Sequence, residues 1–106
     1  MMDEQQFRRV AEDAIAALMQ HLIAEEEKGA EFEAEEQGGV LNLLFEEPAG
    51  KFVVTANAPV RQIWISALST SFKLDWKEEA NQFVLAKTGE ALIPLLDRLI
   101  QEQLAG

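Results

Sequence analysis

Seven glutamates lie within twelve residues, and they are the side chains of this sequence with the clearest chemical potential. They are Glu25, Glu26, Glu27, Glu31, Glu33, Glu35 and Glu36. Lys28 is the only cation among them. Carboxylate oxygens are hard ligands that suit Ca²⁺, Mg²⁺, Mn²⁺ and, with less selectivity, iron. The same charges also suit a basic protein surface, whereas a solvated acidic face needs no ligand at all.

A preformed metal site is not predicted from these acids. Their order lacks the Asp-x-Asp-x-Asp-Gly pattern of a calcium-binding loop. From Glu31 to Glu35 acids alternate with apolar residues, which is typical of a half-buried edge strand. Alternate residues of a strand stand roughly 6–7 Å apart, too far for one ion to contact three of them closely. Any cation site here is therefore expected to be open, weak and hydrated.

Catalysis by other side chains finds little support. The chain has no cysteine and a single histidine, His21. It contains no Gly-rich phosphate loop and no nucleophile elbow. No Ser or Asp stands close to His21 in the sequence as the orienting partner that a catalytic histidine needs. We therefore interpret His21 as a solvated histidine on a helix.

A second feature is an aromatic side chain on the unexpected face of a short strand. The segment Gln62–Ser66 is β-branched and aromatic, as strands are. If Ile63 and Ile65 point into a core, Trp64 points the other way, because strand side chains alternate between faces. Trp64 is then either covered by another segment or exposed as an anchor for a partner.

The elements that position these residues can be read from hydrophobic periodicity. Apolar residues recur every three or four positions over 3–24, which predicts a helix with Asp3 as its N-cap. Alternation and turn signals predict strands over 31–35, 40–45, 51–57, 62–66, 72–76 and 82–86. A Leu-rich helix follows from about residue 90, and Pro94 is tolerated in its first turn.

This order predicts an α+β fold in two layers. An antiparallel sheet of about six strands would carry the N-terminal and C-terminal helices on one face and leave the other toward solvent. No segment is left to cover Trp64, so we expect it to be partly exposed and Trp76 to be more buried. A length of 106 residues predicts one domain, spanning residues 1–106.

Charge and composition restrict the classes of partner that we expect for this protein. The formal net charge of −10 disfavours nucleic acid and anionic membrane surfaces as partners and favours cations or basic proteins. The sequence shows no apolar run long enough to span a membrane and no signal peptide at its start. The absence of cysteine fits a reducing compartment, and we expect a cytoplasmic protein, monomeric without metal.

Several short motifs occur together in an order that resembles the frataxin family. The most specific is Pro59-x-x-Gln62-Ile63-Trp64-Ile65-Ser66. It is accompanied by Gly38-Gly39-Val40-Leu41, the segment 51–57, Asp75-Trp76 and Gly89 before the Leu-rich helix. The acidic first helix and first strand match as well. The length and the bare N-terminus are similar to the bacterial, CyaY-like branch.

The resemblance implies a function that composition alone does not. Frataxins bind iron weakly through an acidic ridge, dock on the cysteine desulfurase and the scaffold protein of iron–sulfur cluster assembly, and tune that assembly. By position, the acidic ridge here would be Glu25, Glu26, Glu27, Glu31, Glu33 and Glu35. The partner-binding surface would be Gln62, Trp64, Asn57, Thr55 and Lys73. The cofactor implied is surface-bound Fe²⁺ or Fe³⁺, without an active site.

Departures from the family pattern affect the site more than the fold. Thr55 and Asn57 stand where relatives often carry Asn and Gln, and Lys73 stands near a position that is often Arg. Lysine cannot reproduce the planar two-pronged contact of arginine. A further aromatic of the family, often Trp, is Phe83 here. The alternatives are a ferroxidase or iron store and a generic acidic interaction module.

Overall fold

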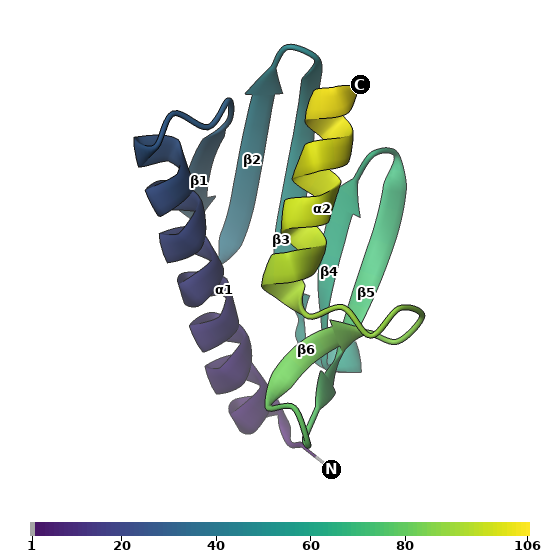
Figure 1. Ribbon diagram of the computed structural model, residues 1–106. Coiled ribbons are helices and arrows are strands. Elements are labelled where there is room, and N and C mark those ends of the chain that lie inside the picture. Colours follow the sequence, from purple (N-terminus) through teal and green to yellow (C-terminus); the bar gives the residue numbers. More distant parts are fainter. Residues whose placement is uncertain (1) are drawn as a thin grey trace.

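The computed structural model, which describes residues 2–106, is a two-layer α–β sandwich (Figure 1). A single sheet contains six antiparallel strands in chain order, and two helices cover one of its faces. The elements are α1 (Glu4–Glu27), β1 (Glu33–Gln37), β2 (Val40–Glu46), β3 (Ala49–Asn57), a 3₁₀ turn (Ala58–Val60), β4 (Gln62–Ala67), β5 (Thr70–Lys77), β6 (Gln82–Leu85) and α2 (Leu92–Ala105). The predicted fold class is confirmed.

Helix α1 begins where the sequence predicts and ends later. The Asp3 side chain accepts a hydrogen bond from the Gln6 amide, and the Gln6 side chain accepts one from the Asp3 amide, which forms a capping box. Periodicity predicts an end near residue 24, but the helix continues to Glu27 and stops before Gly29, whose φ is +96°. Glutamate is a good helix former, so charge density alone does not end a helix.

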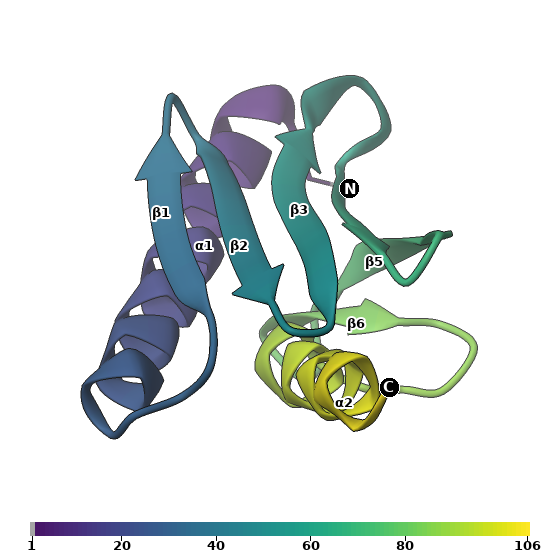
Figure 2. The ribbon, with the colours of Figure 1, turned by 90° about the horizontal axis from the view of Figure 1, so that it is seen from above.

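The core lies between the two helices and the helix-facing side of the sheet. Ile63 and Ile65 of β4 are buried there, as are Leu18 of α1 and Leu96 of α2. These side chains exclude water from the space between the layers, which is the main source of stability in a domain of this size. Both helices are thus used on the Ile63 face, and within residues 2–106 Figure 2 shows no element on the outer face of β1, β2 and β3.

Strand β1 is shifted relative to its prediction. It covers Glu33–Gln37, so Glu31 lies in the bend before the strand rather than within it. Phe32 and Ala34 pack toward the core, as the alternation predicts, while Glu33 and Glu35 are exposed. The register pairs Glu33 with Leu44 and Glu35 with Asn42 of β2. Because the strand starts later than predicted, the acids of this region belong to a helix end, a bend and an edge strand.

Helix α2 begins at Leu92, with Ala91 as its N-cap. Pro94 therefore lies in the first turn, where its missing N–H has no intrahelical partner to lose. Near its C-terminal end, Gln103 Nε2 donates to the Pro48 carbonyl oxygen at 2.9 Å, which ties the helix to the β2–β3 turn. Neither helix of residues 2–106 has the apolar length that crossing a membrane requires.

A surface ion-pair network outside the start of α2 gives the fold a testable pH dependence. Arg98 hydrogen-bonds Glu90 through Nε at 2.7 Å and Nη2 at 2.9 Å. These bonds, with one from the Thr88 hydroxyl, lower the pKa of Glu90 from 4.5 to about 2. A lowered folded-state pKa adds stability above pH 4.5, and this stability is lost as the pH falls toward 2.

We expect Glu90→Gln to remove that part of the acid dependence. The variant should be less stable than wild type at pH 7, and the difference should shrink between pH 4.5 and pH 2. Urea unfolding at pH 7, 4.5 and 3 measures it, with Glu79→Gln in an exposed turn as a control for loss of one charge. The effect should be small and weaker at high salt, because the network is solvent-exposed. A difference that is constant across the pH series would contradict this assignment.

Candidate interaction and cation-binding surface

The open face of the sheet carries the predicted partner residues in two adjacent rows. Thr55 of β3, Trp64 of β4 and Lys73 of β5 are direct neighbours across the strands. Asn57 and Gln62 pair in the next row. Because residues two apart on a strand share a face, all five side chains lie on the side of the sheet away from the helices. The structure thus brings the whole predicted partner set together.

Trp64 is held in place by its neighbours. Its indole Nε1–H donates to Gln62 Oε1 at 2.8 Å, and Gln62 Nε2 donates to Asp75 Oδ1 at 3.0 Å. Lys73 Nζ lies 4.8 Å from the centroid of the indole ring, within the range of a cation–π contact. Trp64 itself is half-buried, which confirms the expectation of partial exposure. The ring is therefore preorganised, and little conformational entropy remains to be lost when it contacts another surface.

Asp75 is a member of this surface that sequence reasoning missed. It lies directly opposite Gln62 in the next strand and orients the Gln62 amide that holds Trp64. A signal was present, because Asp75 stands two residues after Lys73 and therefore shares its face. The Asp75-Trp76 motif does not by itself show which of the two residues lies on the partner surface, because adjacent residues of a strand point to opposite faces.

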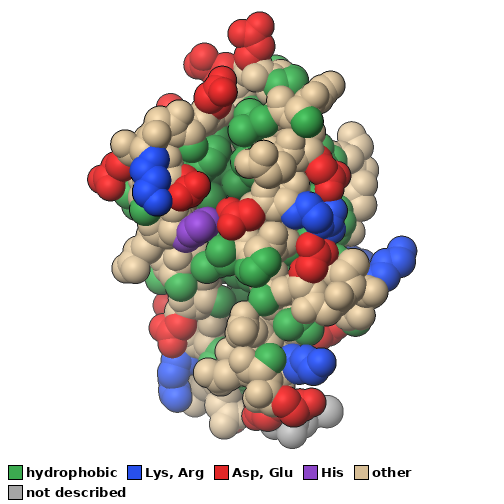
Figure 3. Space-filling view, in the orientation of Figure 1, with side chains coloured by type: hydrophobic (Ala, Val, Ile, Leu, Met, Phe, Trp, Pro, Cys, Tyr) green, Lys and Arg blue, Asp and Glu red, His purple; other side chains and the backbone are tan. Residues whose placement is uncertain are grey.

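The acidic ridge extends around the β1 edge of the sandwich. Glu25, Glu26 and Glu27 occupy the last turn of α1, and acidic side chains gather around that end of the helix in Figure 3. Glu33 and Glu35 extend from β1 onto the open face. Along one row of the sheet, Glu35 pairs with Asn42, Asn42 with Val53, and Val53 with Ser66. Side chains of one row share a face, and Ser66 stands two residues after Trp64. Glu33 and Glu35 of the ridge and the partner residues therefore lie on the same face of the sheet.

The carboxylates of the ridge do not converge. Among residues 2–106, no three His, Asp or Glu side chains lie close enough together to hold a metal ion. One carboxylate, that of Glu25, lies 3.6 Å from Lys28 Nζ, and Glu36, outside the ridge, accepts the Gly39 amide at 3.2 Å. A cation on this surface would have one or two carboxylates and water as ligands, which matches the chemistry of hydrated Mg²⁺, Mn²⁺ or Fe²⁺.

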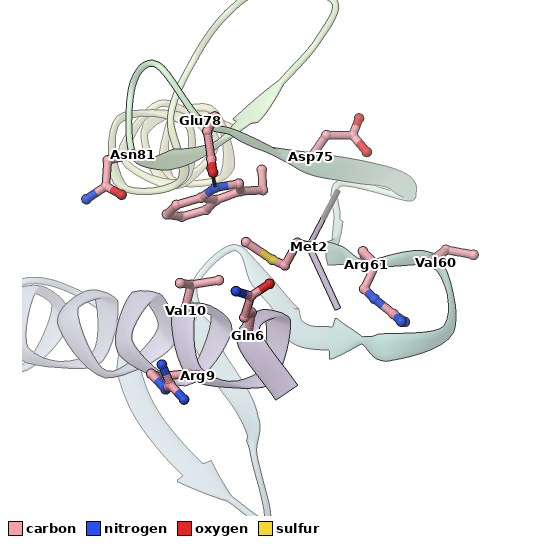
Figure 4. A pocket seen from close by; sticks show the side chains of 10 residues that line it. Met2, Gln6, Arg9, Val10, Val60, Arg61, Asp75, Glu78 and Asn81 are labelled. Atoms are coloured by element: carbon pink, nitrogen blue, oxygen red, sulfur yellow. Dashed lines mark hydrogen bonds between the residues drawn. The ribbon is translucent and has the colours of Figure 1, made fainter. Parts of the chain in front are cut away.

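Trp76 is half-buried, as Trp64 is, but unlike Trp64 it packs against the hydrophobic core. Its indole contacts Phe83 with a centroid separation of 5.1 Å and donates to Glu78 Oε2 at 2.7 Å. A pocket beside it, between the start of α1 and β5, is lined by Met2 and Val10 (Figure 4). The indole therefore lies at the border between the core and this pocket.

Phe83 does not belong to the partner surface. It is 2% exposed and lies edge-on to Phe7 of α1, with ring centroids 5.8 Å apart. Its register partner in β5 is Trp76, on the helix-facing side of the sheet. Phe83 is therefore a core residue in this chain.

The interpretation of His21 as a solvated residue is wrong. Its Nε2 lies 2.8 Å from Asp97 Oδ1, and the His21 side chain is only 30% exposed. Asp97 belongs to α2, so the pair joins the two helices across the surface seen in Figure 3. The partner is 76 positions away in the chain, and for that reason no local pattern could have identified it.

Comparison with known proteins agrees with this architecture. The family model described as "Frataxin-like domain" matches residues 1–106. The iron-sulfur cluster assembly protein CyaY of Pseudomonas putida strain GB-1 is 32% identical over 78 residues, which are 74% of this chain and 70% of the relative. That of Azotobacter vinelandii is 29% identical over 79 residues, 74% of this chain and 71% of the relative.

A solved structure supports the fold independently. Frataxin from Psychromonas ingrahamii superposes with a TM-score of 0.78 and 24% identity, covering 96% of this chain and 91% of the other. Two helices on one face of a six-stranded antiparallel sheet are therefore the fold that this chain shares with that frataxin. The chain belongs to the frataxin family, and the curated relatives that it matches are bacterial CyaY proteins.

Proposed function

We propose that this protein is a non-enzymatic regulator of iron–sulfur cluster assembly. It docks on the cysteine desulfurase and scaffold complex and binds iron weakly through the acidic ridge. The observation that carries the proposal is the preorganised Trp64 on the sheet face opposite the two helices, which also carries Glu33 and Glu35 of that ridge. The names of the bacterial relatives, which are iron-sulfur cluster assembly proteins, support the pathway.

The two parts of the surface suit different parts of a partner. A half-buried tryptophan flanked by polar groups is the kind of side chain that anchors protein interfaces. The exposed Glu33 and Glu35 add a negative border that would face basic side chains and speed the encounter. The partner should therefore present a pocket for the indole beside a basic patch.

Iron on the ridge would be cargo rather than a resident cofactor. The exposed carboxylates fit a hard, hydrated cation, and their separation supports weak binding with water completing the ligand set. Oxidation of Fe²⁺ by the protein would require closely convergent ligands that stabilise Fe³⁺, and nothing in the arrangement of the ridge favours this alternative. Binding and regulation therefore suit the ridge better than ferroxidase catalysis.

Salt-dependent association with a purified cysteine desulfurase tests the proposal. Binding measured by isothermal titration or biolayer interferometry should be strong at low ionic strength and should weaken steeply with NaCl, because screening shortens the Debye length to about 10 Å at 0.1 M and about 3 Å at 1 M. Failure of the folded protein to bind the desulfurase, alone or with scaffold protein, at any salt concentration would overturn the proposed function.

A further inference from the structure

Glu26 makes a contact that distinguishes it from the other acids of the ridge. Its Oε1 accepts a hydrogen bond from the Ala34 amide nitrogen at 2.7 Å, and the residue is half-buried. Glu25 is half-buried too, but its carboxylate faces Lys28, whereas Glu27, Glu33 and Glu35 are exposed. A short bond to a backbone amide is the usual way for a partly buried carboxylate to replace lost water.

The amide that donates to Glu26 belongs to the edge strand of the sheet. Ala34 is the second residue of β1, and within residues 2–106 β1 pairs only with β2. The Ala34 N–H is directed to Glu26 and so is not used in the ladder. A free edge amide is a template on which another chain can add a strand. The Glu26 carboxylate therefore closes this edge at one point.

The same bond links the two halves of the acidic ridge. Between Glu26 and Ala34 the chain passes through Gly29, whose positive φ suits a tight turn but which has no side chain to pack. The Glu26 contact spans this segment and connects the last turn of α1 directly with β1. It therefore sets where Glu33 and Glu35 stand relative to the helix end.

We propose that Glu26 is a positioning residue, which fixes β1 against α1 and protects the sheet edge, and is not itself a cation ligand. The positioning role follows from the contact alone, whereas the exclusion of Glu26 from cation binding rests on the proposed function of the ridge. Loss of the carboxylate should therefore loosen β1, whereas loss of its charge alone should not.

Amide exchange at Ala34, measured by NMR, tests the positioning role. Glu26→Ala should raise the exchange rate of this amide at least about tenfold, because a charge-assisted hydrogen bond is lost. Glu26→Gln keeps a side-chain oxygen and should stay much closer to wild type. Glu27→Ala, in the exposed neighbour, should leave the amide protected. Wild-type protection of Ala34 in Glu26→Ala would overturn the proposal.

A Mn²⁺ titration of the same variants separates this proposal from the function of the ridge. If the ridge binds Mn²⁺, Glu26→Gln should weaken binding no more than Glu79→Gln, a distant loss of one charge, and Glu26→Ala should weaken it further. A greater loss in Glu26→Gln than in Glu27→Gln would make Glu26 a ligand and contradict the proposal. No Mn²⁺ binding by wild type would count against the ridge function, and the exchange experiment would still decide the role of Glu26.

Discussion

Replacing Trp64 with alanine should abolish most of the affinity for the desulfurase complex and leave the fold intact. Truncation of a central aromatic anchor typically costs about 2 kcal/mol or more, which raises the Kd roughly thirtyfold. The loss of stability should be about 1 kcal/mol or less, because the indole lies on the outer face and contributes cross-strand contacts rather than core packing. Binding by titration and stability by urea unfolding give the two numbers.

Two matched variants make the Trp64 result specific. Trp64→Phe keeps an aromatic ring but loses the N–H that Gln62 Oε1 accepts, so its affinity should lie between wild type and Trp64→Ala. Trp76→Phe changes the other tryptophan, on the helix-facing side, and should leave the affinity unchanged. If Trp64→Ala binds like wild type, or if it unfolds, the sheet face is not the docking surface we propose.

Reversing the charge of the exposed ridge should have the second-largest effect. In the triple variant Glu31→Lys, Glu33→Lys and Glu35→Lys, attraction to a basic patch becomes repulsion at three positions. Exposed charge pairs are each worth about 0.2–1 kcal/mol, so the Kd at low salt should rise on the order of tenfold or more. Most of the change should appear in the association rate. Binding kinetics at low and high NaCl measure this change.

The control for this variant changes net charge without touching the ridge. Asp13→Lys, Glu47→Lys and Glu79→Lys add the same charge at exposed positions elsewhere. This control should retain most of the affinity, and its salt dependence should remain close to that of wild type. Equal losses in the two triple variants would show that overall charge, and not the ridge, determines the association.

The sheet and its faces could be predicted from the sequence because alternation and periodicity are local. Trp64 could be placed on the outer face from Ile63 and Ile65 alone, and Asp3 could be recognised as a cap from the composition of a helix start. The ends of the helices and strands were predicted less accurately. Helix α1 continues through three consecutive glutamates and stops just before Gly29, whose positive φ ends a helix more effectively than charge does. Strand β1 begins two residues later than its alternating pattern.

Contacts between distant segments could not be predicted. Nothing near His21 indicates that Asp97 will lie beside it once α1 and α2 pack on the same face. The partial burial of Trp76 beside a pocket between the start of α1 and β5 is also a matter of packing between distant segments, which periodicity does not encode. The contact of Glu26 with the Ala34 amide likewise depends on the path of the intervening turn. Such contacts decide which acids of a cluster are free to bind and which hold the structure together.

An NMR titration of the labelled protein with unlabelled cysteine desulfurase tests the proposed docking surface most directly. We predict that the largest perturbations fall on Glu33 and Glu35 of β1 and on Thr55, Trp64 and Lys73 of the open face, with the Trp64 indole N–H among the first signals to move. A separate Fe²⁺ titration under anaerobic conditions should perturb the ridge and spare Trp64. Desulfurase-induced perturbations confined to the helix-facing side, around His21 and Asp97, would contradict docking through the open face.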